Sequence, residues 1–145
     1  MASLYPELHP GATGHATLTV GEEHTAPHVG SGVIRVLATP VLVNLMEAAA
    51  LACAESALPP GQQSLGIALN IRHIAATPVG MQVRAQAKLE AVEGRTLTFS
   101  LVAHDESDLI GDGTHQRVVV NIGRFDERLA KKVAIVDARL KTLDR

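Results

Sequence analysis

One long apolar segment without glycine or proline constrains the fold of this chain more than any other feature. It runs from Val41 to Ala57, after Thr39-Pro40, and Pro59-Pro60-Gly61 closes it. Threonine is a good N-cap and proline fits the first helical position, so we predict a helix that Thr39 caps. Its apolar face is wide and much of the rest is alanine or valine, which predicts cover on most sides. The residues of this face are Leu42, Leu45, Met46, Ala49, Ala50 and Cys53.

After this helix the hydrophobic pattern changes to period two, which is typical of half-buried antiparallel strands. Glu93-Gly94 has the composition of a tight hairpin turn, and Asp105 to Asp112 is expected to be a longer connection. A further short strand is expected before the helix, followed by a loop from Glu22 to Ser31. The predicted strands are His15–Val20, Ser64–Ile74, Met81–Val92, Arg95–His104 and Gly113–Ile122.

These elements predict a single α+β domain over residues 1–145, with a loose N-terminal segment over 1–14. An antiparallel sheet wrapped around one apolar helix satisfies the burial demands of both, which is the hotdog arrangement. A C-terminal helix is expected over 125–143. Its narrow apolar seam either packs on the chain's own sheet or contacts another subunit, and both interpretations stay open. The seam residues are Leu129, Val133, Val136, Leu140 and Leu143.

Composition and charge exclude several classes of protein. Thirteen basic and fifteen acidic residues give a net charge of −2, which offers no general attraction to nucleic acid. Only Tyr5, Phe99 and Phe125 are aromatic, too few for a base-stacking surface. The single cysteine, Cys53, cannot form an internal disulfide, and neither a signal peptide nor a membrane span is recognisable. We therefore expect a cytoplasmic protein without nucleic-acid or membrane partners.

Common catalytic and metal-binding motifs are not found. His24 and His28 are four residues apart, but Pro27 lies between them in loop-like sequence, so we expect no metal site. The sequence has neither a phosphate-binding glycine motif nor a GxSxG nucleophile motif. Cys53 lies within an apolar helix face without an obvious base, which argues against a cysteine nucleophile.

Three polar residues remain as candidates for chemistry, and each also has a purely structural interpretation. Glu47 lies in the most apolar segment, where a carboxylate is costly to ionise without a partner. It could equally join Asn44 and Glu55 on a polar stripe. His73 lies near the end of a predicted strand, where a lone histidine is often structural, and Thr39 has a sufficient role as the N-cap.

Several separated strings resemble the fluoroacetyl-CoA thioesterase-like hotdog family, in the family's order, from about residue 30 to residue 127. The first is the helix opening Ala38-Thr39-Pro40-Val41-Leu42-Val43-Asn44-Leu45-Met46-Glu47. The second is Ser64-Leu65-Gly66, followed by His73 and Ala75-Ala76-Thr77-Pro78-Val79-Gly80. The hairpin and following strands match at Val92-Glu93-Gly94-Arg95, Ala103-His104-Asp105 and Ile110-Gly111-Asp112-Gly113-Thr114-His115-Gln116-Arg117.

The resemblance implies an acyl-CoA thioesterase with a Thr/Glu/His triad at Thr39, Glu47 and His73, and with Gly66 lining the acyl pocket. It implies no cofactor, because CoA is part of the substrate, and a homodimer, with a tetramer as the alternative, whose site lies at the subunit interface. Whether His73 faces Thr39 and Glu47 of its own chain or of a partner chain stays open, because the sequence does not assign these residues to chains. A non-catalytic acyl-CoA-binding protein is the second hypothesis. A hotdog hydratase is disfavoured, because no aspartate has a histidine five residues later.

Two further expectations concern the substrate. The stretch from Val29 to Leu37 contains no aromatic ring, so we expect an aliphatic pocket and a short acyl-CoA other than fluoroacetyl-CoA. Arginines on strands are usually exposed and solubilising, so none is assigned to the phosphates of CoA. These arginines are Arg72, Arg84, Arg95, Arg117 and Arg124.

Overall fold

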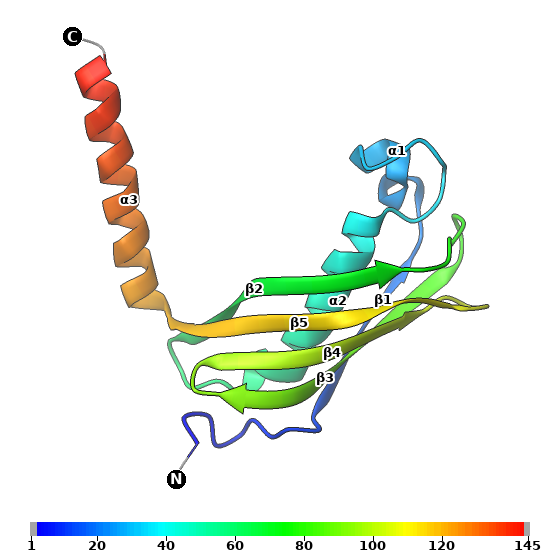
Figure 1. The fold of residues 1–145 in the computed structure, drawn as a ribbon, viewed down its shortest axis with the longest axis horizontal. Coiled ribbons are helices and arrows are strands. Elements are labelled where there is room, and N and C mark those ends of the chain that lie inside the picture. Colours follow the sequence, from blue (N-terminus) through cyan, green and yellow to red (C-terminus); the bar gives the residue numbers. More distant parts are fainter. Residues whose placement is uncertain (1–2, 144–145) are drawn as a thin grey trace.

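The computed structural model describes residues 3–143 and has the expected architecture, an antiparallel sheet curved around one central helix (Figure 1). The five strands are β1 (Thr13–Thr19), β2 (Gln62–His73), β3 (Gln82–Glu93), β4 (Thr96–His104) and β5 (Leu109–Asn121). Their order across the sheet is β1-β3-β4-β5-β2, so β2 is an edge strand. The helices are α1 (Ala26–Val29), α2 (Thr39–Ala54) and α3 (Ile122–Leu143), with 3-10 turns at Glu22–His24 and Glu55–Ala57.

Helix α2 supplies the centre of the core, as its sequence predicts. Its apolar side chains pack against the alternating inner residues of β3 and β4, such as Val83, Leu89 and Phe99, which are fully buried. The described part of the N-terminal segment has no helix or strand before Thr13, yet Tyr5 and Leu8 also enter this core. Met1 and Ala2 lie outside the described residues. By length and composition Thr39–Ala57 could span a membrane, but a core helix passes the same test.

The start of α2 differs from the prediction. Ala38 is the N-cap, Thr39 is the first helical residue, and no side chain caps the helix. The prediction that Thr39 is the N-cap was therefore wrong, and its hydroxyl is free for another partner. The predicted loop over 22–31 also contains a 3-10 turn and the short helix α1.

Strand β5 begins at Leu109, four residues before its predicted start at Gly113. The glycines there allow close backbone approach, because a Cβ on Gly113 would lie 2.2 Å from the Asn70 carbonyl oxygen. Strand β2 has a register irregularity between Gly66 and Ala68 opposite β5. This irregularity lies beside α2, where the polar side chains of the candidate site gather.

Candidate active site

Two separate groups of polar side chains lie along α2. The first is a pair at its N-terminus: Thr39 Oγ1 and His73 Nδ1 are 2.7 Å apart and hydrogen-bonded. His73 comes from the last position of β2, so the strand's end delivers the ring to the helix start. The hydroxyl that does not cap the helix thus fixes the histidine, and this bond lies within one chain.

Burial gives His73 a distinct electrostatic character. It lowers the pKa of the imidazole, opposed by the backbone of Ala75, so the neutral ring is favoured. The other ring nitrogen, Nε2, is buried and has no hydrogen-bond partner among the described residues. A neutral imidazole bonded to a hydroxyl is suited to accept or pass on a proton near neutral pH.

A hollow of about 300 Å³ opens beside this pair. Apart from Ser31, Thr39 and His73, its lining is aliphatic, and Gly66, which was expected to line the acyl pocket, is not part of it. The lining residues are Ala26, Ser31, Val36, Leu37, Thr39, His73, Ile74, Ala75 and Ala76. The hollow therefore places apolar surface next to the Thr39–His73 pair.

The second group surrounds Glu47, eight residues further along α2. Arg117 Nη1 donates to Glu47 Oε2 at 3.3 Å, and the exposed fractions of the two side chains are 6% and 33%. Eight residues of helix correspond to about 12 Å of helix axis. No hydrogen bond joins Glu47 to Thr39 or His73 among the described residues, so within one chain the three residues lie in two separate groups.

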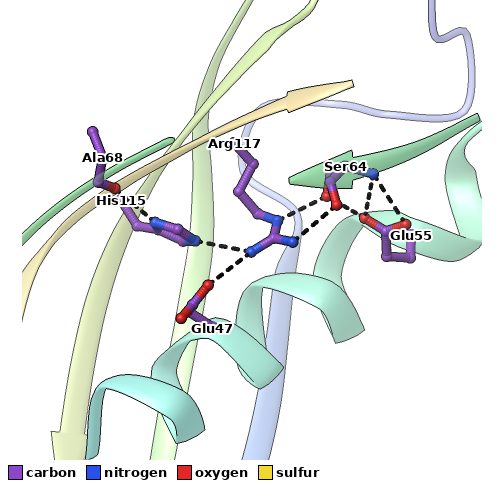
Figure 2. Close-up of polar contacts among 6 residues, drawn as sticks. All are labelled: Glu47, Glu55, Ser64, Ala68, His115 and Arg117. Carbon is purple, nitrogen blue, oxygen red and sulfur yellow. Dashed lines mark hydrogen bonds and ion pairs between the residues drawn. The ribbon is translucent and has the colours of Figure 1, made fainter. Parts of the chain in front are cut away.

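Arg117 is buried, which makes the expectation of an exposed, solubilising arginine wrong for this position. Side chains along β5 alternate between the two faces of the sheet. Arg117 therefore shares the inner face with His115 and Val119, and both are buried as well. The guanidinium Nη1–H faces His115 Nε2 at 3.2 Å, and His115 Nδ1 bonds to the Ala68 carbonyl oxygen at 2.8 Å (Figure 2). The three consecutive valines at 118–120 leave the phase of the alternation in β5 undefined, so no local pattern in the sequence identified either residue.

The contacts of His115 define its protonation. A carbonyl only accepts, so Nδ1 carries a proton, and a guanidinium only donates, so Nε2 is the acceptor. Burial lowers the pKa of His115, and the positive charge of Arg117 adds to this effect, while the Ala68 carbonyl and Glu47 oppose it. The neutral tautomer with its proton on Nδ1 therefore satisfies every contact. Phe99 of β4 packs near this ring, with a centroid separation of 6.1 Å.

Gly66 completes the second group at the irregularity in β2. A Cβ at this position would lie 3.0 Å from Glu47 Oε2 and 3.2 Å from His115 Cε1. The absent side chain keeps the space in front of the Glu47 carboxylate open. Gly66, selected by resemblance alone, thus adjoins Glu47.

The other candidates from the sequence have structural roles or none. Cys53 donates from Sγ to the Ala12 carbonyl oxygen, and burial raises the pKa of its thiol. His24 Nδ1 accepts the Gly21 N–H. Residues 3–143 contain no group of three or more His, Cys, Asp or Glu side chains placed to hold a metal.

Comparisons with known proteins identify the family to which this fold belongs. A family model described as fluoroacetyl-CoA-specific thioesterase matches residues 20–123. A fluoroacetyl-CoA thioesterase of Streptantibioticus cattleyicolor is 43% identical over 97 residues, covering 67% of this chain and 70% of that protein.

Solved structures extend the similarity to the fold. A crystal structure of a fluoroacetyl-CoA thioesterase superposes with a TM-score of 0.81 at 35% identity, covering 86% of this chain and 97% of that one. A hypothetical protein of Thermus thermophilus, a thioesterase superfamily member, gives a TM-score of 0.85 at 26% identity and covers 90% and 97% of the two chains. The whole hotdog body is therefore shared with these relatives.

Proposed function

The chain belongs to the family of fluoroacetyl-CoA-specific thioesterases, and we propose that it hydrolyses a short acyl-CoA thioester to the free acid and CoA, with Thr39, Glu47 and His73 as catalytic residues. Membership makes it a thioester hydrolase acting on acyl-CoA. The observation that carries the finer proposal is that the matched residues 20–123 contain both half-sites, the Thr39–His73 pair and the Glu47–Arg117 pair.

In the proposed reaction Glu47 acts on the thioester carbonyl carbon. It either removes a proton from an attacking water or attacks the carbon itself, forming an anhydride that water then cleaves. In the first route the proton taken from water passes to the departing sulfur as the C–S bond breaks. In the second route CoA leaves as the thiolate, and the water that cleaves the anhydride supplies the proton that completes the thiol. The neutral imidazole of His73 accepts or returns the proton, and Thr39 holds this ring in place.

The start of α2 can contribute little to an oxyanion hole. Pro40 has no N–H, and the N–H groups of Val41 and Leu42 already donate to the Ala38 carbonyl oxygen at 3.1 Å. The Thr39 N–H is left at this helix end to meet the developing negative charge, and the Thr39 hydroxyl can donate there only when His73 Nδ1 carries the proton of their mutual hydrogen bond. This supports a role for Thr39 in contact with substrate.

We further propose that the working unit is a homodimer in which the Thr39–His73 pair of one copy meets Glu47 of the other. The separation of the half-sites along α2 favours this arrangement over a complete site in one chain. The free edge of the sheet at β2 exposes Leu65, Ile67 and Leu69, and such an edge can pair with a second copy.

Helix α3 supports the same proposal. It extends past the β2 edge, away from the sheet (Figure 1), and none of its described side chains is buried. Its apolar seam of Leu129, Val133, Val136, Leu140 and Leu143 is therefore available to a second copy. Of the two interpretations of the seam, the subunit contact is the one we propose.

The aliphatic lining of the hollow beside His73 supports a short aliphatic acyl group rather than fluoroacetyl. We also infer that the protein acts in the cytoplasm, without a cofactor and without nucleic-acid or membrane partners. The single, partly buried cysteine is compatible with a reducing compartment.

A thiol-release screen over a panel of acyl-CoA esters tests the function. We expect turnover with short esters, and a loss of about a hundredfold or more in Glu47→Gln and His73→Ala. Glu90→Gln is the matched control, because this carboxylate accepts from Ser100 in an exposed pair on the sheet. Saturable binding of the esters without thiol release would instead identify a non-catalytic acyl-CoA-binding protein, and unchanged rates in both site variants would refute the triad.

A further inference from the structure

The guanidinium of Arg117 is held from two sides, and only one side belongs to the proposed triad. On the first side Nη1 donates to Glu47 Oε2. On the other side Nε donates to Ser64 Oγ at 2.7 Å and Nη2 donates to the Ser64 carbonyl oxygen at 3.0 Å (Figure 2). The contacts to Ser64 are the shorter ones, so Ser64 contributes more than Glu47 to the position of the guanidinium.

Ser64 is in turn fixed by a second carboxylate. Glu55 follows the last residue of α2, and its carboxylate accepts from both the hydroxyl and the backbone N–H of Ser64, the latter at 3.1 Å to Oε1. The hydroxyl has a single proton. Because that proton goes to Glu55, the lone pairs of Oγ are left to accept from Arg117 Nε–H. The donor and the acceptor are therefore defined for every hydrogen bond in the series Glu55–Ser64–Arg117–Glu47.

This hydrogen-bonded series has a negative charge at each end and a buried positive charge between them. A guanidinium that is 5% exposed needs partners for its N–H groups and its charge, because removing an unpaired charge from water is strongly unfavourable. Glu47 alone offers one contact at 3.3 Å. Glu55 supplies the second negative charge, one hydroxyl away.

We propose that Glu55 is a positioning residue of the active site, acting through Ser64 and Arg117 to hold the Glu47 carboxylate in place. The sequence suggested a stripe shared by Glu47 and Glu55, but the two side chains are connected through β2 and β5 instead of along the helix. Their connection by charge-assisted hydrogen bonds makes the orientation of Glu47 depend on a residue about two turns away. This inference rests on the proposed function of Glu47.

Steady-state kinetics of Glu55→Ala measure the positioning effect. We expect kcat to fall about tenfold or more, because small misplacements of a catalytic group are costly, while KM changes less than about twofold. Glu55→Gln keeps an oxygen acceptor for Ser64 but loses the negative charge, so its kcat should lie between those of Glu55→Ala and the wild type. The control is Glu90→Ala, which removes the exposed Glu90–Ser100 pair and should leave kcat unchanged.

A double variant separates positioning from a merely structural role. Ser64→Ala should lower kcat as Glu55→Ala does. The double variant should have no lower kcat than either single variant, because both changes break the same hydrogen-bonded series. If Glu55 served only to accept the Ser64 backbone N–H, that bond would persist in Ser64→Ala. Adding Glu55→Ala to Ser64→Ala would then lower kcat by the full factor seen for Glu55→Ala alone. Any of three results overturns the proposal: such additivity, an unchanged kcat in Glu55→Ala, or a fall in activity that is explained by the fraction of unfolded protein.

A measurement that needs no activity keeps the inference distinct from the proposed function. The Arg117 Nε–H, buried and bonded to Ser64, should give a slowly exchanging side-chain signal in proton–nitrogen spectra, assigned by its loss in Arg117→Lys. Exchange should accelerate in Glu55→Ala and in Ser64→Ala. If no acyl-CoA is hydrolysed but the signal behaves so, the proposed function fails while the Glu55-dependent placement of Arg117 stands; a signal unaffected by either change overturns the inference.

Discussion

Replacing Gly66 with alanine tests whether the placement of Glu47 limits catalysis. The new Cβ would lie 3.0 Å from Glu47 Oε2. An ordinary contact begins near 3.4 Å, so the carboxylate must move by about 0.4 Å. If it moves away from Arg117, the 3.3 Å bond to Nη1 lengthens to about 3.7 Å and is lost. His115 Cε1, at 3.2 Å, leaves no room for the Cβ to shift to the other side.

A misplacement of 1 Å can cost about a hundredfold in rate, so we expect kcat/KM of Gly66→Ala to fall by about tenfold in the thiol-release assay. The fold should be retained, because Gly66 does not have a positive φ and alanine suits a strand at least as well as glycine. Gly123→Ala in α3 is the control, since its Cβ would meet Asn121 Oδ1 at an ordinary 3.5 Å. A folded Gly66→Ala protein with wild-type kcat/KM would show that Glu47 need not be held where the structure has it.

Two other predictions concern the dimer and pH. If each site combines Glu47 of one copy with His73 of the other, co-refolding Glu47→Gln with His73→Ala should restore about a quarter of wild-type activity. Half of the dimers are then mixed, and each mixed dimer has one intact site out of two. No recovery of activity in demonstrably mixed dimers would place the triad within one chain. Burial lowers the pKa of His73 and His115 in the folded protein, so the unfolded chain binds more protons and the free energy of unfolding should fall as pH drops below about 6.5. Thermal unfolding between pH 7.5 and 5 measures how steeply the free energy of unfolding depends on pH. His115→Gln should make this dependence weaker. An equal pH dependence in the wild type and in His115→Gln would contradict the lowered pKa of His115.

The elements with a clear hydrophobic period were predictable from the sequence. Helix α2 and strands β2, β3 and β4 lie within a few residues of their predicted bounds, because burial on one face imposes a period that neighbouring residues repeat. The start of β5 was missed because Gly111-Asp112-Gly113 has the composition of a turn. These glycines are instead required by close approach: a Cβ on Gly111 would meet the Arg72 carbonyl oxygen at 2.9 Å.

The site was predictable only in part, because its residues are distant in sequence. Thr39, Glu47 and His73 stood out as polar candidates in the sequence, while their grouping into a triad and the selection of Gly66 came from the resemblance. Their neighbours depend on which strands pair. The pairing of Arg117 with Gly66 across β5 and β2 brings the guanidinium beside Glu47. No local pattern contains that register, so an inward-facing arginine could not be distinguished from an outward-facing one without the sheet.

The inner face of β5 carries a polar cluster that fits the proposed role of Glu47 better than a role in stability. His115 and Arg117 occupy positions that face α2, where β3 and β4 place valine, alanine, leucine and phenylalanine. Apolar residues of similar volume at such positions are often neutral or stabilising relative to buried charges. The fold could therefore form without this pair, and their burial has a clear benefit only if the orientation of Glu47 matters. Because the buried guanidinium is anchored chiefly by Ser64, which Glu55 holds, its burial is stabilised by residues outside the proposed triad. The Glu47 carboxylate stays partly exposed, as the proposed contact with a substrate requires.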